Sequence, residues 1–196
     1  MTRLATVLRG LGLPGVLEET LGDFTGLFQK WNRSINLSAA RSENELIEHI
    51  VDSLHVVPHL QAVGAASLRI LDVGAGGGLP AVVAAICLPD AQITALEPVH
   101  KKHAFLRTAA RELALPNLEP LAQRLDDHAL RDYDAAMSRA TFDLREWLLL
   151  GLSAVRVGGT TFGFEAVPRH DLPPGTHRHP YALEDKSRAI VVLRRS

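Results

Sequence analysis

The sequence predicts an α/β protein with a mainly parallel sheet, helices on both faces of that sheet and an N-terminal helical extension. From residue 68 onward, short apolar segments typical of strands alternate with longer segments of helical spacing. The first of these strands, over residues 68–73, runs into a glycine-rich turn and then into an apolar helix. Residues 1–60 show helical spacing alone, which indicates an extension in front of the α/β unit.

Composition restricts the possible functions before any motif is considered. The chain has 196 residues, of which 46% are hydrophobic and 22% charged, as in an ordinary soluble globular protein. Its formal net charge is −1, so a nucleic-acid surface would have to be a local patch. The single cysteine, Cys87, excludes an internal disulfide, and no ligand cluster accompanies His49, His55 and His59, so we expect no metal site. Neither a signal peptide nor a membrane-length apolar run is found, and we expect a cytoplasmic protein.

The N-terminal part is expected to be helical with one interruption. Apolar residues recur at helical spacing up to Trp31, which we expect in the core and not as a base-stacking platform. Residues 31–41 break this spacing and predict a loop. Ser42, followed three residues later by Glu45, predicts a capping box that starts the next helix. We expect residues 1–63 to pack on a catalytic domain over residues 64–196, with residues 64–67 as the linker.

The remaining elements follow from the alternation of apolar segments. Strands are predicted over residues 68–73, 92–96, 118–122, 133–137, 160–164 and 189–193, and helices over 81–88, 101–115 and 143–155. The prolines between residues 168 and 180 predict an irregular stretch. Strands linked by helices in this way form a parallel sheet, and ligands bind at the carboxyl ends of its strands.

The glycine turn identifies the kind of ligand. Its glycines, Gly74, Gly76 and Gly78, form G-x-G-x-G, whereas a dinucleotide fingerprint requires a glycine where this chain has Leu79. No Lys–Ser or Lys–Thr pair follows, which excludes a P-loop. With Asp72 two residues before it, the turn resembles the first motif of S-adenosylmethionine-dependent methyltransferases. Glu97 ends the next strand, where an acid binds ribose hydroxyls. The alternative is a tight turn in an α/β protein without a cofactor.

Several further segments resemble one family. They are WNRSINLSAAR (31–41), E-x-x-x-H-I-V-D-S-L (45–54), LDVGAGGGLP (71–80), K-K-x-x-F-L (101–106), S-R-A (138–140) and R-x-I-V-V-L (188–193). Together they resemble the glucose-inhibited division protein B family, whose members methylate guanine N7 in bacterial small-subunit ribosomal RNA. The resemblance implies a Rossmann-like class I methyltransferase with S-adenosylmethionine as cofactor. It also implies 16S ribosomal RNA, or a small-subunit assembly intermediate, as the partner of a chain that we expect to be monomeric.

The resemblance also assigns roles to individual residues. The cofactor contacts implied by the family are Gly74, Leu79, Leu125 and Asp126, the last two beside the adenine, and they join Asp72, Gly76, Gly78 and Glu97 of the turn and strand end. Arg139 and Arg188 match arginines of the family motifs. We place Arg139 near cofactor and substrate, with Asp72 or Asp143 as its partner if its role is structural. RNA phosphates are expected at Lys101, Lys102, Arg124 and Arg188.

The chemistry implied by the resemblance suits these residues. Guanine N7 has a free lone pair at neutral pH and needs alignment and electrostatics, not a strong general base. We expect Arg139, with five fixed donors, to be the residue most directly involved in catalysis. His49 and Asp52 are three residues apart on one helix, which fits either a local hydrogen bond or a substrate contact.

Two departures from the family pattern leave other functions open. Ala81 stands where the family usually has glycine, and Glu165 with Ala166 stands where it usually has Lys-Gly. A glutamate at that position would repel RNA phosphate. The alternatives are therefore a divergent methyltransferase for a small molecule or protein, and a non-catalytic paralogue that binds cofactor or RNA.

Overall fold

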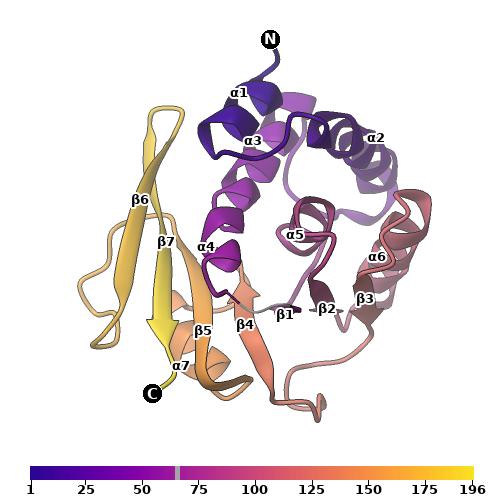
Figure 1. Cartoon of the computed structure of the whole chain (residues 1–196). Helices are drawn as coiled ribbons and strands as arrows, with labels where there is room; N and C mark the ends of the chain where they lie inside the picture. The colour runs from indigo at the N-terminus through magenta and orange to yellow at the C-terminus, as the bar shows by residue number, and fades with distance from the viewer. Residues whose placement is uncertain (65–66) are drawn as a thin grey trace.

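The computed structural model describes residues 1–64 and 67–196, so residues 65 and 66 of the predicted linker lie outside the described residues. The described part contains a seven-stranded sheet in the order β3-β2-β1-β4-β5-β7-β6. Strands β1 to β5 are parallel, and β7 runs antiparallel between β5 and β6, which confirms a mainly parallel sheet (Figure 1). The strands are β1 Arg69–Val73, β2 Gln92–Leu96, β3 Leu118–Leu121, β4 Tyr133–Ser138, β5 Val155–Glu165, β6 His177–Leu183 and β7 Lys186–Arg194.

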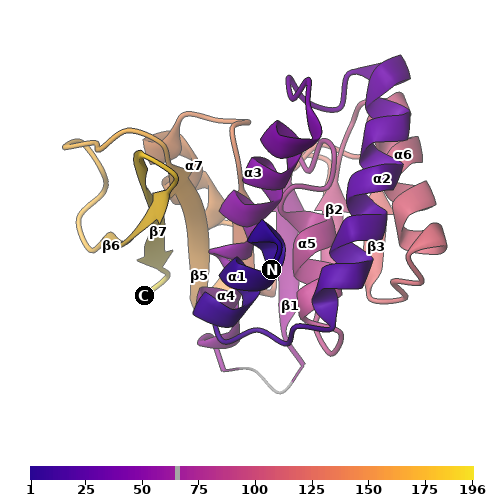
Figure 2. The ribbon, with the colours of Figure 1, turned by 90° about the horizontal axis from the view of Figure 1, so that it is seen from above.

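Helices cover both faces of the sheet, but unequally. They are α1 Arg3–Gly10, α2 Leu17–Ile35, α3 Glu43–Leu54, α4 Val57–Gln61, α5 Ala81–Cys87, α6 His100–Glu112 and α7 Leu144–Gly151. The crossover helices α5 and α6 lie on one face and α7 on the other, and α2 and α3 pack against α5 (Figure 2). This change of face marks the switch point between β1 and β4, where open α/β sheets bind ligands. None of the helices in the described ranges is long and apolar enough to cross a membrane.

The two faces of the sheet bury separate hydrophobic clusters because strand side chains alternate between faces. Ile70 and Ile93 point to the face covered by α5 and the N-terminal helices, where Phe24 and Phe28 are fully buried. Leu71 points to the opposite face, where it joins the cluster around Trp147 of α7. The near-continuous apolar runs in β1 and β2 are therefore required by burial on both sides.

Several elements differ from the sequence prediction. Helix α2 continues to Ile35 and ends where Asn36 adopts a left-handed conformation (φ 51°), so the predicted loop over residues 31–41 starts too early. Helix α7 ends at Gly151, because Val155 already belongs to β5, which is longer than predicted. The stretch before the last strand is not wholly irregular. It contains β6, an edge strand that tolerates Pro180 because one side of an edge strand needs no partner.

The capping box before α3 forms in altered form. The Ser42 Oγ accepts a hydrogen bond from the backbone N–H of Glu45 at 3.2 Å, as predicted. The Glu45 carboxylate accepts from the backbone N–H of Arg41, at 2.7 Å, and not from that of Ser42. Both contacts fasten the loop before α3, and Asn32 adds two more by bonding the Ser38 N–H and the Ala40 carbonyl, each at 3.0 Å. This loop is therefore held in one place beside the glycine turn.

Candidate active site

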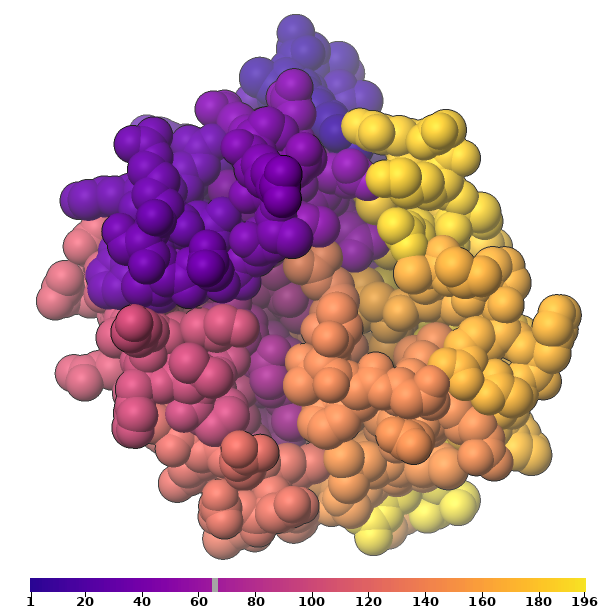
Figure 3. Space-filling model, turned by 180° about the vertical axis from the view of Figure 1, so that it is seen from behind, coloured from indigo at the N-terminus to yellow at the C-terminus, as the bar shows by residue number. Residues whose placement is uncertain are grey.

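A cavity of about 720 Å³ opens at the carboxyl ends of β1 and β4. Its walls are the glycine turn, the loop over residues 37–40, α3, the segment over residues 138–144 and the hairpin β6–β7. Figure 3 shows this region as a hollow between the segments coloured near residue 100 and near residue 140. Segments far apart in the chain thus enclose one site.

The glycine turn forms the floor of the cavity. Gly74, Gly76 and Gly78 all have positive φ, which side chains rarely adopt. At Gly74 a Cβ atom would lie 2.5 Å from the Thr141 side chain, so only glycine fits there. The backbone N–H groups of Gly74 and Ala75 both donate to the Leu96 carbonyl, at 2.9 and 3.0 Å. The turn is therefore shaped by its glycines and tied to the end of β2.

Glu97 lies against this turn. Its Oε2 accepts from the Gly76 N–H and its Oε1 from the Val99 N–H, each at 2.8 Å. The residue is only 4% exposed, and it does not line the cavity directly. A carboxylate has about four acceptor positions, so two further hydrogen bonds can still be accepted.

Asp72 lies beneath the turn and outside the cavity lining. It is fully buried, and its Oδ2 accepts from the backbone N–H of Ala81 at the start of α5, at 3.0 Å. Its Oδ1 has no hydrogen-bond partner in the described part of the chain. Burial raises the pKa of Asp72 to about 7. The hydrogen bond to Asp72 Oδ2 therefore stabilises the start of α5. Its donor is the backbone N–H of Ala81, the residue that stands where the family usually has glycine.

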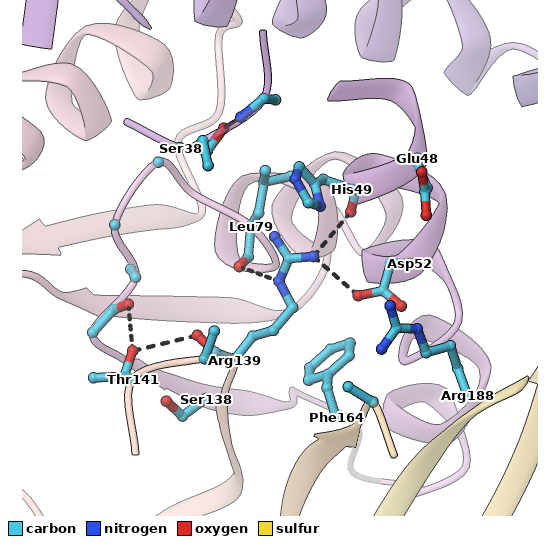
Figure 4. Close-up of a pocket in the computed structure, with 18 of the residues that line it drawn as sticks. Ser38, Glu48, His49, Asp52, Leu79, Ser138, Arg139, Thr141, Phe164 and Arg188 are labelled. Atoms are coloured by element: carbon cyan, nitrogen blue, oxygen red, sulfur yellow. Dashed lines mark hydrogen bonds and ion pairs between the residues drawn. The ribbon is translucent and has the colours of Figure 1, made fainter. Parts of the chain in front are cut away.

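Arg139 lies at the centre of the site (Figure 4). Its Nη1 donates to Asp52 Oδ2 at 3.0 Å and to the His49 carbonyl at 3.4 Å, and its Nε donates to the Leu79 carbonyl at 3.3 Å. The chain leaves β4 through Ala140, which has a positive φ of 58°. Such a conformation in a non-glycine residue is uncommon and often marks a functional site.

The partner of Arg139 is neither of the two acids considered from the sequence. Asp143 instead caps α7 by accepting from the N–H groups of Arg145 and Glu146, and it pairs with Arg169. Asp52 pairs with Arg139 and not with the His49 side chain, although its position on α3 made a local bond possible. Burial and the nearby Arg139 cation lower the pKa of His49, which favours the neutral imidazole.

Tyr181 was missed by the sequence analysis. Its hydroxyl donates to Asp52 Oδ1 at 2.6 Å, and its ring stacks on His55 with the ring centres 3.9 Å apart. Asp52 and Tyr181 are 129 positions apart, and β6 was expected to be irregular. No local pattern indicated this contact.

The charges around the cavity are largely paired. Lys186 contacts Glu48 at 2.7 Å, and Glu165 accepts from Arg178 at 2.9 and 3.1 Å. Glu165 is 4% exposed, so the repulsion of RNA phosphate expected from this residue is offset by a direct guanidinium partner. Arg188 differs, because its Nε is buried and has no acceptor among the described residues.

The other predicted site residues lie at different distances from the cavity. Leu79, Arg139 and Arg188 line it, as does Lys102 at the start of α6. Leu125 is buried in the cluster with Leu96, beside the end of β2. The residues that face solvent outside the cavity lining are Lys101, Arg124 and Asp126.

Trp31 is half-buried and lies 5.7 Å from the Phe105 ring, so it packs against the core, as expected. This packing joins α2 to α6.

The parallel strands, the helix arrangement and the glycine turn beside a strand-end acid define a Rossmann-like, S-adenosylmethionine-dependent methyltransferase fold. Residues 17–170 match the family described as rRNA small subunit methyltransferase G, and the chain belongs to that family.

Curated relatives agree with the family assignment, and solved structures agree with the fold. The ribosomal RNA small subunit methyltransferase G of Burkholderia pseudomallei (strain 1106a) is 42% identical over 166 residues, which cover 81% of this chain and 70% of that protein. That of Burkholderia mallei (strain NCTC 10229) is also 42% identical, and the match covers 81% of this chain and 71% of that protein.

Two solved structures share the fold at low identity. Magnesium protoporphyrin IX methyltransferase from Synechocystis PCC 6803 has a TM-score of 0.62 and 16% identity, covering 88% of this chain and 97% of that one. TrmN from Thermus thermophilus has a TM-score of 0.62 and 20% identity, covering 84% and 53%.

Proposed function

We propose that this chain transfers the methyl group of S-adenosylmethionine to N7 of a guanine in 16S ribosomal RNA. Family membership supports the reaction and the RNA class. The observation that carries the assignment to this cavity is the position of Arg139, beside the glycine turn and at the end of β4. A cytoplasmic location and a monomeric state belong to the same proposal.

The residues of the site fit the cofactor. The turn over residues 74–78 presents bare backbone to the cavity, and at Gly74 a Cβ would collide with the Thr141 side chain. Glu97 retains acceptor capacity for ribose hydroxyls, and Leu125 with Asp126 would lie beside the adenine. The buried, unpartnered Nε of Arg188 is a donor suited to a carboxylate or phosphate oxygen. The cofactor supplies a sulfonium methyl group, and these residues bind and orient it.

The remaining chemistry requires alignment, not proton removal. Guanine N7 attacks with its own lone pair, so the site needs no strong general base. Burial and the Arg139 cation lower the pKa of His49, which favours its neutral form and so disfavours an added positive charge near the sulfonium. Arg139 stays charged and offers directed donors to guanine O6, to a phosphate or to the carboxylate of the cofactor.

RNA binding is proposed at a local basic patch. Lys101, Lys102, Arg124 and Arg188 are its members, and Lys102 also borders a second cavity of about 790 Å³ between α2, α3 and the start of α6. Because the net charge is −1, this patch must supply the attraction that the whole molecule lacks.

The N-terminal helices belong to the active unit in this proposal. Residues 1–63 form a helical segment that packs on the catalytic domain over residues 64–196. Within this segment, α3 contributes His49 and Asp52 to the cavity. Residues 1–63 would therefore be needed for catalysis and not only for stability.

The test is methylation of small-subunit RNA from cells that lack this protein. Purified chain, labelled S-adenosylmethionine and either free 16S RNA or isolated small subunits should give N7-methylguanine at a single position by mass mapping. Large-subunit RNA serves as the control substrate. Cofactor binding without methylation of either RNA form would favour the non-catalytic alternative, and methylation of a protein or small molecule alone would favour the divergent one.

A further inference from the structure

We propose that Asp52 and Tyr181 are positioning residues that orient the Arg139 guanidinium for methyl transfer. A chain of hydrogen bonds would then connect the C-terminal hairpin, through α3, to the end of β4. The inference rests on the proposed function and names residues on which its rate depends.

The hydrogen bonds from Tyr181 through Asp52 to Arg139 are continuous and largely shielded from solvent. Asp52 uses one carboxylate oxygen for each neighbour, Oδ1 for the Tyr181 hydroxyl at 2.6 Å and Oδ2 for Arg139 Nη1 at 3.0 Å. The side chains of Arg139 and Asp52 are 15% and 14% exposed. A hydrogen-bonded ion pair at this depth is less screened than a surface pair and holds a defined geometry.

The contacts leave one edge of the guanidinium free. Arg139 Nε donates to the Leu79 carbonyl, and Nη1 donates to Asp52 and to the His49 carbonyl. Among the described residues, Nη2 has no acceptor. Figure 4 shows the guanidinium held between Leu79 and α3 within the cavity. The partners on Nε and Nη1 therefore set the direction in which the donors of Nη2 point.

The surroundings of Tyr181 keep its hydroxyl protonated, so it can donate a hydrogen bond to Asp52. Burial raises the pKa of its hydroxyl, and the adjacent Asp52 carboxylate raises it further, so the phenol stays protonated at neutral pH. Its ring stacks on His55, which fixes the hydroxyl over Asp52. Tyr181 also pairs with Arg188 across β6 and β7, so one hairpin places both residues at the cavity.

The groups that surround the hydrogen-bonded series Tyr181–Asp52–Arg139 carry both positive and negative charge. His49 and His55 lie on α3 and beside it, Glu48 on α3 is paired with Lys186, and Arg188 faces them from β7. Asp52 is thus the carboxylate that faces Arg139 directly, and removal of its charge should loosen the guanidinium more than removal of the Tyr181 hydroxyl.

The experiment compares Tyr181→Phe and Asp52→Asn with the wild type and with a control, Thr25→Val. The control removes a buried hydroxyl that donates to the Leu21 carbonyl within α2, outside the cavity. The first readout is the ¹⁵N–¹H signal of Arg139 Nε, assigned by its loss in Arg139→Lys. We expect this signal to move in both site variants and to stay in place in the control.

The second readout is the single-turnover rate with small-subunit RNA at saturating cofactor. We expect about fivefold loss for Tyr181→Phe and at least about tenfold for Asp52→Asn, from the ordinary strengths of neutral and charged hydrogen bonds. The RNA concentration that gives half of the maximal single-turnover rate should stay within about twofold of the wild-type value, since no substrate contact is removed. In an Arg139→Ala background, Tyr181→Phe should cause no further loss, because residues that act through one another are not additive.

Distinct results would overturn the inference or the function beneath it. An unmoved Arg139 signal in Asp52→Asn, or an additive loss in the Arg139→Ala background, would reject the positioning role. A wild-type protein that methylates no small-subunit RNA would instead reject the proposed function, and the Arg139 signal would still decide whether Asp52 and Tyr181 orient the guanidinium.

Discussion

The backbone N–H of Gly76 donates to Oε2 of Glu97 at 2.8 Å, so the glycine turn after β1 and the acid that ends β2 form one unit. The second oxygen of this carboxylate accepts from Val99, which turns the chain toward α6. Glu97 therefore shapes the proposed cofactor site as well as offering it acceptors.

Replacement of Glu97 by alanine should weaken S-adenosylmethionine binding by on the order of 1.5–3 kcal/mol, the value of a charge-assisted hydrogen bond. Glu97→Gln should lose less, because its amide oxygen can still accept from Gly76. Calorimetry measures both affinities. Binding of NAD in place of S-adenosylmethionine would contradict the cofactor assignment.

Replacement of Arg139 by alanine should lower the methyl-transfer rate at least about tenfold, equivalent to 1.4 kcal/mol of barrier. Arg139→Lys should restore only part of this rate, because a point charge cannot donate to Leu79 and Asp52 in the same fixed directions. Single-turnover methylation and thermal melting are measured together. Full activity in folded Arg139→Ala would end the assignment, and a collapsed melting temperature would point to a structural role.

Reversal of Lys101 and Lys102 to glutamate should weaken RNA binding and flatten its dependence on salt, because each lost phosphate contact lowers the slope by about one. Arg9→Glu, on the exposed end of α1, is the control for a change in charge outside the patch. Filter binding from low to moderate salt gives both slopes. Equal slopes for wild type and the lysine variant would show that the patch is misplaced.

Asp72 should make the protein less stable as pH rises. Burial raises its pKa from 3.8 to about 7, so the folded state binds its proton more tightly than the unfolded chain does. The resulting stability is fully present below about pH 4 and is lost as pH rises through about 7. Asp72→Asn should remove this loss, because an amide has no proton to release over this range.

Urea unfolding of both proteins from pH 5 to 8 tests the role of Asp72. The half-buried histidines His49 and His55 have lowered pKa values and act in the opposite direction, but they contribute equally to both proteins. The difference in unfolding free energy between Asp72→Asn and wild type should therefore grow from pH 5 to about pH 7 and level off above it. A difference that stays constant would show that Asp72 does not titrate in this range.

The sequence by itself was enough to predict the α/β class, the glycine turn and Glu97 at the end of β2. These features depend on short-range patterns: apolar runs, glycines that allow positive φ, and the position of an acid directly after a strand. The cap at Ser42 could be predicted for the same reason, because its acceptor and donor are three positions apart.

Tertiary structure alone decided the partners of the charged residues. Arg139 pairs with Asp52, 87 positions away, and Asp52 in turn binds Tyr181, 129 positions away. Tyr181 lies on β6, which was not predicted because the prolines between residues 168 and 180 indicated an irregular stretch. From the sequence, Glu165 was expected to repel RNA phosphate, but in the folded protein it forms a salt bridge with Arg178. A side chain's local sequence limits its chemistry, but its partner is set by how the sheet order brings distant strands and helices together, and short-range patterns do not encode that order.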